Sequence, residues 1–229
     1  MKAYAIVIKD HETSEIGYNN LCKSSEIVKN NFKITKFDAI VPERNKTLME
    51  RYNIKWNYPW SGVVSDFSTG LTKSAYKTAN PEARIACALS HWTLWSKAAA
   101  DNDTILILEH DACFTAKLDI TISKKFNILG INNPLGCTRL SKVYYDKILE
   151  NGQDQQLVPW IDSQHIPQGL AGNSAYIITP DGAKQMLKLV KDFGLWPNDA
   201  LMCRQLVKGL GVSRKFYTTT QKLRSTTTQ

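Results

Sequence analysis

Short stretches rich in apolar residues alternate along the chain with longer amphipathic stretches. Apolar runs predict buried strands over 3–8 and 104–108, and we predict further strands over 33–41, 174–179 and 212–217. Apolar residues at helical spacing predict helices over 13–29, 81–100, 180–194 and 197–209. Residues 53–79 have no clear period and are rich in aromatic and turn-forming residues, so we expect a long loop there.

The order of these elements indicates the fold class. A strand, a helix and a second strand open the chain, which is typical of α/β proteins with parallel strands. The 229 residues are enough for one large domain. We therefore predict a single α/β domain over 1–229, with a mainly parallel central sheet flanked by helices.

The helix over 81–100 has the clearest start signal in the chain. Asn80 is a good N-cap residue, Pro81 suits the first helical position, and Glu82 complements the positive end of the helix dipole. We expect this helix to lead directly into the apolar strand over 104–108.

The composition is that of an ordinary globular protein. Hydrophobic residues make up 43% and charged residues 22%, which excludes a disordered or fibrous chain. No apolar run approaches the ~20 residues needed to cross a membrane, and the N-terminus lacks the pattern of a signal peptide. Five widely spaced cysteines without a CxxC pair argue against a disulfide framework and a zinc site. We therefore expect reduced thiols and a cytoplasmic location.

The net charge of +8 is concentrated toward the C-terminus. The segment 200–229 contains no acid and six basic residues, namely Arg204, Lys208, Arg214, Lys215, Lys222 and Arg224. A segment of one charge sign attracts anions, so a diphosphate, a nucleic-acid backbone or lipid head groups are candidate partners. A solvated basic tail is the simpler alternative.

One predicted strand ends abruptly in two acids. The run at 105–108 is followed by Glu109, His110 and Asp111. Ligands of open α/β sheets bind at the carboxyl edge of the strands, and residues two apart on extended chain point to the same side. Neighbouring carboxylates repel unless they share a cation, and Mn²⁺ and Mg²⁺ prefer oxygen ligands. The pair therefore predicts a metal site beside a diphosphate, although an exposed acidic loop has the same residues.

Four blocks of sequence resemble glycosyltransferase family 25, the lipooligosaccharide and collagen galactosyltransferase family. The family has a Cys-x-Leu-Ser-His helix and an apolar strand ending in Glu-Asp-Asp, which read here as CALSHWTLW at 87–95 and ILILEHDACF at 105–114. GNSAYIITPDGAKQML at 172–187 resembles its aromatic strand and following helix, and PNDALMCRQL at 197–206 resembles its Pro-x-Asp segment. Each block is moderately specific, but their shared order over 81–206 is a stronger signal.

The resemblance implies a GT-A-like fold with a Rossmann-like half that binds a UDP-sugar donor, and transfer with inversion at the anomeric carbon. It also implies roles for three acids. Asp111 is expected to ligate Mn²⁺ or Mg²⁺, and Glu109 to assist through a metal-bound water or by holding the donor sugar. Asp199 is expected to be the general base for the acceptor hydroxyl, although an ordinary acid at a helix start has the same position.

Two departures from the family pattern bear on the metal. His110 stands in place of the central acid of Glu-Asp-Asp, where an imidazole weakens the site, faces away from it, or itself contacts metal or donor. Many GT-A enzymes use a further histidine near the C-terminus, whereas the last histidine here is His165. We therefore expect one carboxylate, the diphosphate and waters to hold the metal.

Several other residues are candidates for binding the donor. Lys9 follows the first strand, where α/β sheets commonly contact nucleotides. Arg84 lies early in a helix, where the dipole disfavours a cation, which indicates an anionic partner such as Glu109 or a phosphate. His91 either contacts the donor or packs its helix against the strand. The candidates from the basic segment are Arg214, Lys222 and Arg224.

The acceptor is left open between two classes. Known members of the family favour a glycan, such as the core oligosaccharide of a lipopolysaccharide. The basic surface favours hydroxymethylated DNA, as in phages that glycosylate their genomes, in which case the protein would act in the host cytoplasm. A third alternative is an inactive relative that binds a sugar or nucleic acid, because His110 replaces an acid.

Overall fold

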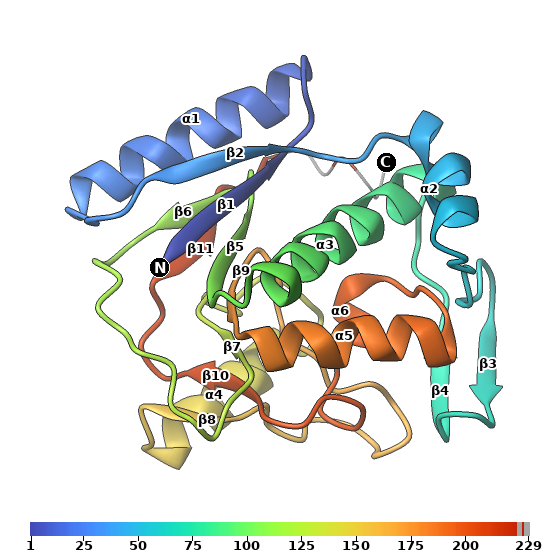
Figure 1. The fold of residues 1–229 in the computed structure, drawn as a ribbon. Helices are drawn as coiled ribbons and strands as arrows, with labels where there is room; N and C mark the ends of the chain where they lie inside the picture. The colour runs from blue at the N-terminus through green and yellow to red at the C-terminus, as the bar shows by residue number, and fades with distance from the viewer. Residues whose placement is uncertain (224–225, 227–229) are drawn as a thin grey trace.

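The computed structural model describes residues 1–223 and residue 226. At its centre is a seven-stranded sheet in the order β2-β1-β5-β9-β7-β10-β8 (Figure 1). Its strands are β1 (Lys2–Val7), β2 (Ile34–Asp38), β5 (Ile105–Glu109), β7 (Ile128–Gly130), β8 (Gln155–Leu157), β9 (Ala175–Ile178) and β10 (Leu210–Ser213). The α/β class is confirmed, as are the strands predicted near 3–8, 33–41, 104–108 and 174–179.

The sheet is mixed, so the prediction of a mainly parallel sheet is wrong. β1 pairs in parallel with β2 and β5, and β7 with β10. β9 runs antiparallel between β5 and β7, and β8 is antiparallel to β10. The pattern of a short apolar run does not show whether the strand will be parallel or antiparallel to its neighbours. β9 is reversed because the chain re-enters the sheet at the edge where β5 ends, and Glu109 N donates to Ser174 O there at 2.8 Å.

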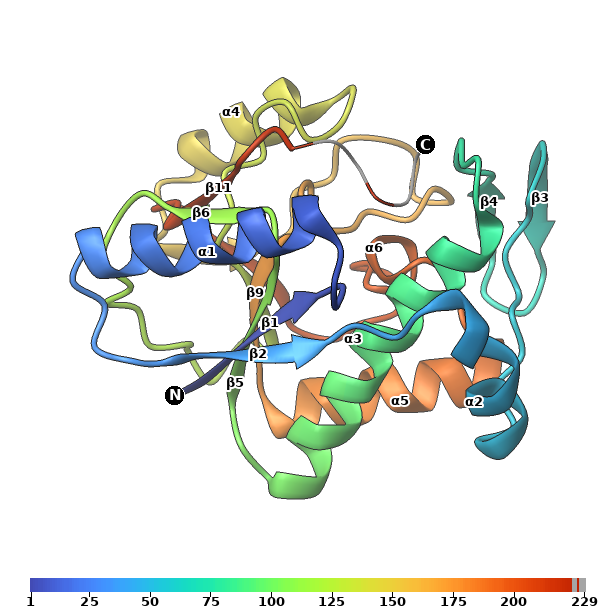
Figure 2. The same cartoon turned by 90° about the horizontal axis from the view of Figure 1, so that it is seen from above.

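Helices cover both faces of the sheet. α3 (Pro81–Asp101) and α5 (Pro180–Phe193) pack together on one face. α1 (Glu12–Ile27) covers the other face beside a small ribbon of β6 (Ala112–Phe114) and β11 (Thr218–Thr220) (Figure 2). Ile105 and Ile107 of β5 belong to the first core, and Leu106 and Leu108 to the second. β5 is apolar along its length because both of its faces are covered.

The start of α3 agrees with the sequence signal. Asn80 Oδ1 accepts a hydrogen bond from Ala83 N at 3.0 Å, and Pro81 occupies the first turn. The helix ends where Asn102 adopts a left-handed conformation with φ 53°. This placement aligns Cys87, Ser90 and His91 on one helical face, because residues three and four apart are neighbours on a helix.

Two predictions for irregular and helical segments are wrong. The segment 53–79, expected to be a loop, contains a hairpin of β3 (Val63–Asp66) and β4 (Leu71–Ser74). The helix expected over 197–209 is only the single turn of α6 (Asn198–Leu201), because Arg204 N then donates to Gln168 O and the chain joins the loop before β9. The last predicted strand, at 212–217, begins earlier, as β10.

The remaining elements have weak sequence signals. They are a 3-10 turn at Pro42–Arg44, α2 (Asn45–Arg51) and α4 (Ser141–Asn151). All five cysteines lie in the described part of the chain and are free thiols, as predicted. Within residues 1–223 and 226, we find no helix with the length and apolar character of a membrane span.

Candidate active site

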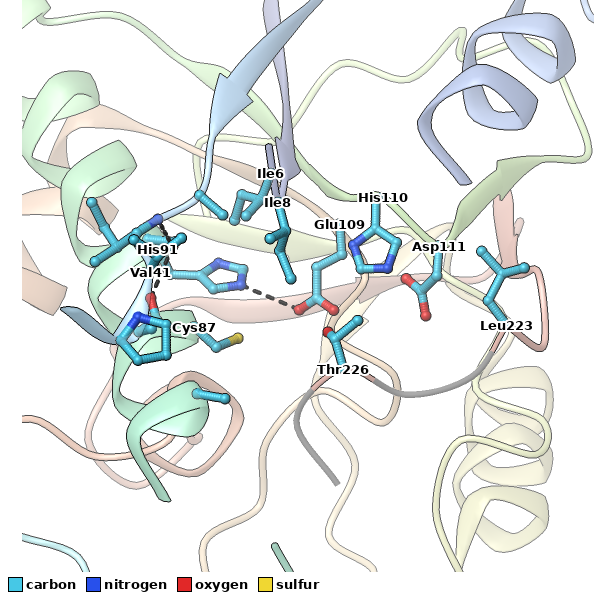
Figure 3. A pocket seen from close by; sticks show the side chains of 16 residues that line it. Ile6, Ile8, Val41, Cys87, His91, Glu109, His110, Asp111, Leu223 and Thr226 are labelled. Carbon is cyan, nitrogen blue, oxygen red and sulfur yellow. Dashed lines mark hydrogen bonds and ion pairs between the residues drawn. The ribbon is translucent and has the colours of Figure 1, made fainter. Parts of the chain in front are cut away.

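A cavity opens at the edge of the sheet where β1, β2 and β5 end (Figure 3). Its empty volume is about 880 Å³, part of it open to solvent. One wall comes from the ends of β1 and β2, one from α3, and one from the end of β5 and the turn after it. Leu223 and Thr226, near the C-terminus, also line it.

Both acids predicted to bind metal line this cavity. Glu109 is the last residue of β5, and Asp111 follows in the turn to β6. Asp111 Oδ1 is buried and has no hydrogen-bond partner among the described residues. Burial, and then the charge of Glu109, raise the pKa of Asp111 to about 7. A buried carboxylate oxygen without a partner, beside a second carboxylate, fits a divalent cation with hard oxygen ligands.

His110 lies between the two acids in sequence, and its ring packs toward α1. A Cβ added at Gly17 would come within 2.7 Å of His110 O and 3.1 Å of His110 Cδ2, so this helix approaches the turn only because residue 17 is glycine. Burial lowers the pKa of His110. The ring also lines the cavity (Figure 3). A contact with the donor remains a prediction.

His91 is completely buried on α3 and joins the helix to two strands. Its Nδ1 lies 2.8 Å from Tyr176 Oη on β9, and its Nε2 lies 3.2 Å from Glu109 Oε1 on β5. The thiol of Cys87 completes a group of three possible ligand atoms within 4.8 Å of one another. Burial raises the pKa of Cys87, which keeps this thiol protonated. The packing role expected for His91 is therefore present, together with a direct contact to an acid of the cavity.

Asp199, the predicted base, is the second residue of α6 and lies on the wall of a second hollow. That hollow is formed by Tyr76, the turn at 138–140 and the loop at 161–171. Burial raises the pKa of Asp199; the charge of Arg84 opposes this shift and that of Glu109 adds to it. Asp199 is therefore within electrostatic reach of Glu109, although it faces a different hollow.

Arg84 lies on α3 within electrostatic reach of Cys87, which lines the first cavity, and of Asp199, which lines the second hollow. Its guanidinium stands 5.1 Å from the ring centre of Tyr76, and its Nε is buried with no hydrogen-bond partner in the described part of the chain. Its charge acts on Asp199, an acid other than the Glu109 expected from the sequence. The unpaired Nε leaves a donor for a further anion.

The other basic candidates are spread over the molecule. Lys9 and Arg214 are exposed and do not line the cavity, and Arg214 follows β10. Lys222 is exposed beside Leu223, which does line it. Arg224 lies outside the described residues. Of these four, Lys222 is the one that the structure brings next to the cavity.

Two buried polar residues at this edge were not predicted from the sequence as part of the site. Asn173 and Ser174 immediately precede β9, and the side-chain atoms Nδ2, Oδ1 and Oγ have no hydrogen-bond partner within residues 1–223 and 226. Their position beside β5 follows from the bond between Glu109 N and Ser174 O. The available signal was a polar pair directly before the apolar run AYII.

Three comparisons with known proteins complete this description. The sequence model of glycosyltransferase family 25 (LPS biosynthesis protein) matches residues 19–202, which is well over half of the chain. A search of curated proteins gave no match. A solved structure described as the apo form of WbbM, a bifunctional glycosyltransferase, aligns with a TM-score of 0.46 and 11% identity. That alignment covers 94% of this chain and 38% of the other, and at this similarity it supports no conclusion.

Proposed function

The chain belongs to glycosyltransferase family 25, and we propose that it transfers a sugar from a UDP-sugar, with a divalent metal, to a hydroxyl of a glycan. The observation that carries this proposal is the pair Glu109 and Asp111 at the cavity, with the buried Asp111 Oδ1 lacking a partner in the described chain. A carboxylate left in that state is suited to a cation that also binds a diphosphate.

The position of the cavity supports a nucleotide donor. It lies at the carboxyl ends of β1, β2 and β5, where α/β sheets bind nucleotides. Apolar side chains such as Ile6, Ile8 and Val41 line part of it, and the two acids line another part (Figure 3). A flat base and a charged diphosphate therefore have separate surfaces, and Lys222 beside Leu223 is our candidate for the diphosphate.

Asp111 and Glu109 would hold the Mn²⁺ or Mg²⁺ ion, which supplies positive charge to offset the charge of the departing nucleoside diphosphate. Asp111 is the stronger ligand candidate because its Oδ1 has no partner in residues 1–223 and 226, whereas Glu109 Oε1 already contacts His91. Both metals suit these oxygen ligands.

We assign the acceptor to the second hollow and the role of base to Asp199. The burial that raises the pKa of Asp199 makes its carboxylate a stronger base. Asp199 accepts the proton of the acceptor hydroxyl while that oxygen forms a bond to the anomeric carbon. The bond from this carbon to the diphosphate oxygen breaks, and UDP leaves with the electron pair. Attack opposite the leaving group inverts the anomeric carbon.

Contacts within the protein that involve the basic segment 200–229 favour a glycan acceptor over DNA. Arg204 Nη1 donates to Val158 O at 2.6 Å, and its guanidinium lies 4.8 Å from the ring centre of Trp160. Lys215 pairs with Asp119 at 3.0 Å. Two of the six basic residues therefore have partners within the protein, which weakens the case for a continuous phosphate-binding surface. The family description, which names LPS biosynthesis, also favours a glycan.

The proposal is tested by UDP release from a panel of UDP-sugars with Mn²⁺, run without acceptor, with lipopolysaccharide core oligosaccharide, and with hydroxymethylcytosine DNA. We expect slow release without acceptor and faster release with the oligosaccharide, both lost on removal of Mn²⁺ with EDTA. Stimulation by DNA alone would replace the glycan with the DNA acceptor. If UDP is released from no donor, the proposed enzyme activity is contradicted and an inactive relative that binds a sugar or nucleic acid is favoured. The next test would then be the His110→Asp variant.

A further inference from the structure

Four side chains form a continuous hydrogen-bonded series from the core to the cavity. Trp95 Nε1 on α3 donates to Tyr176 Oη on β9 at 2.8 Å. Tyr176 Oη lies 2.8 Å from His91 Nδ1. His91 Nε2 lies 3.2 Å from Glu109 Oε1, the contact drawn as a dashed line in Figure 3. Trp95, Tyr176 and His91 each have 0% of their surface exposed. Water therefore does not reach the contacts among these three residues, which must satisfy one another, whereas the side chain of Glu109 is 30% exposed at the cavity.

The positions of the protons follow from counting donors and acceptors. An indole N–H can only donate, so Tyr176 Oη accepts from Trp95. The remaining contact of that hydroxyl within the described chain is His91 Nδ1, so the hydroxyl proton points to Nδ1 and this nitrogen is an acceptor. A neutral imidazole then carries its proton on Nε2, which donates to Glu109 Oε1.

The other protonation states leave a buried donor unsatisfied. With a proton on Nδ1, alone or in the imidazolium, Tyr176 Oη would receive two donors and its own proton would have no acceptor. In the neutral Nδ1–H form, His91 Nε2 would also direct a lone pair at the carboxylate of Glu109. An unmade hydrogen bond is costly in the interior, so the series selects a single tautomer.

We propose that Trp95, Tyr176 and His91 form a positioning relay that holds Glu109 in one orientation, with Oε1 bound by the Nε2–H of His91 and Oε2 left for the ligand. No described residue makes a hydrogen bond to Oε2. The relay extends the proposed function, and only the effect that we predict on turnover rests on that function. The tautomer is a property of the protein alone.

The relay also bears on a second group of possible metal ligands. The side chains of Cys87, His91 and Glu109 offer three ligand atoms that lie within 4.8 Å of one another. In the Nε2–H tautomer, Nε2 of His91 has no free lone pair, so a metal at this group would have to displace that proton and break the hydrogen bond to Glu109.

The test is the ¹⁵N spectrum of histidine side chains in the protein without donor or metal, at mildly alkaline pH, with His91 assigned from its absence in His91→Gln. We expect the Nε2–H tautomer in the wild type. In Tyr176→Phe, which keeps the ring and removes the hydroxyl, we expect a mixture of tautomers. Tyr144→Phe is the matched control, since Tyr144 is 2% exposed and its hydroxyl takes no part in the hydrogen bonds that join Trp95, Tyr176, His91 and Glu109.

Turnover gives the second measurement. We expect Tyr176→Phe to lower kcat for UDP-sugar hydrolysis about tenfold or more, with KM for the donor nearly unchanged, as when an orienting partner is lost. Tyr144→Phe should alter neither. An Nδ1–H tautomer in the wild type overturns the relay, and so does an unchanged tautomer and kcat in a folded Tyr176→Phe protein. If the wild type releases no UDP from any donor, with or without acceptor, the proposed function fails while the spectrum still decides the relay.

Discussion

Asp66 in the β3–β4 hairpin and Asp111 after β5 are both largely shielded from solvent, but Asp66 has a cationic partner whereas Asp111 lies beside the carboxylate of Glu109. Asp66 Oδ2 is 2.8 Å from Lys73 Nζ, with side-chain exposures of 9% and 4%. Asp66 Oδ1 also accepts a hydrogen bond from Ser68 N at 3.0 Å. Burial alone would raise the pKa of Asp66, but Lys73 and Ser68 outweigh it and lower the pKa to about 2. Asp111 has no such partners, and its pKa rises to about 7.

The difference separates an acid that stabilises the fold, Asp66, from an acid that is available to a ligand, Asp111. Lys73 Nζ also donates to Asn57 O at 2.8 Å and lies 4.5 Å from the ring centre of Trp196, so the Asp66–Lys73 pair attaches the hairpin to the core. Asp111 contributes an unsatisfied charge near Glu109, which lowers stability and is retained where a ligand uses it. Removing one acid should therefore affect folding, and removing the other should affect chemistry.

The largest effect should come from Asp111→Ala. Losing the metal ligand removes several kcal/mol of transition-state stabilisation, so metal-dependent turnover should fall on the order of a thousandfold. The measurement is UDP release with saturating Mn²⁺, and Asp181→Asn, whose side chain is 80% exposed, is the control. Turnover within tenfold of the wild type would remove Asp111 from the metal site.

Asp199→Asn should lower transfer more than donor hydrolysis. A general base contributes about a hundredfold or more to the rate of transfer. Hydrolysis uses water in place of the acceptor, so it does not need a glycan bound in the second hollow. We expect kcat for transfer to oligosaccharide to fall about a hundredfold, while KM for the UDP-sugar changes little. Equal loss of both reactions would indicate that Asp199 acts on the donor and not as the acceptor base.

The same substitution should lower the free energy of unfolding at Asp66 but not at Asp111. Asp66→Asn leaves Lys73 buried without its counter-charge and should lower the free energy of unfolding by about 3 kcal/mol. Asp111→Asn removes a repelling charge and should leave that free energy unchanged or raise it. Urea denaturation at neutral pH without metal measures both. A loss of similar size in the two variants would contradict the comparison.

The smallest effect is the acid dependence of the hairpin ion pair. The pKa of Asp66 is about 2 in the folded protein against 3.8 in the reference state, so its stabilising contribution is complete above pH 3.8 and is lost as pH falls through 2. The shift corresponds to about 2 kcal/mol. The stability difference between wild type and Asp66→Asn should therefore shrink from pH 4 to pH 2, and a constant difference would refute the pairing.

Local patterns predicted the elements around the candidate site well. The cap at Asn80 and the run at 105–108 depend on neighbouring residues, and these produced α3, β5 and the placement of Glu109 and Asp111. The helix over 197–209 failed because contacts between Arg204 and Gln168, distant in sequence, replaced its later turns. The hairpin was missed because its strands are short and one is anchored by a buried lysine.

The family, the α/β class and the pair of acids at the end of β5 follow from the sequence alone, because each depends on residues close together in the chain. The direction of β9, the second hollow at Asp199 and the contact of His91 with Tyr176 became evident only in the folded protein. These features depend on contacts between segments far apart in sequence, where packing and the satisfaction of buried polar groups select one arrangement among several with the same local pattern.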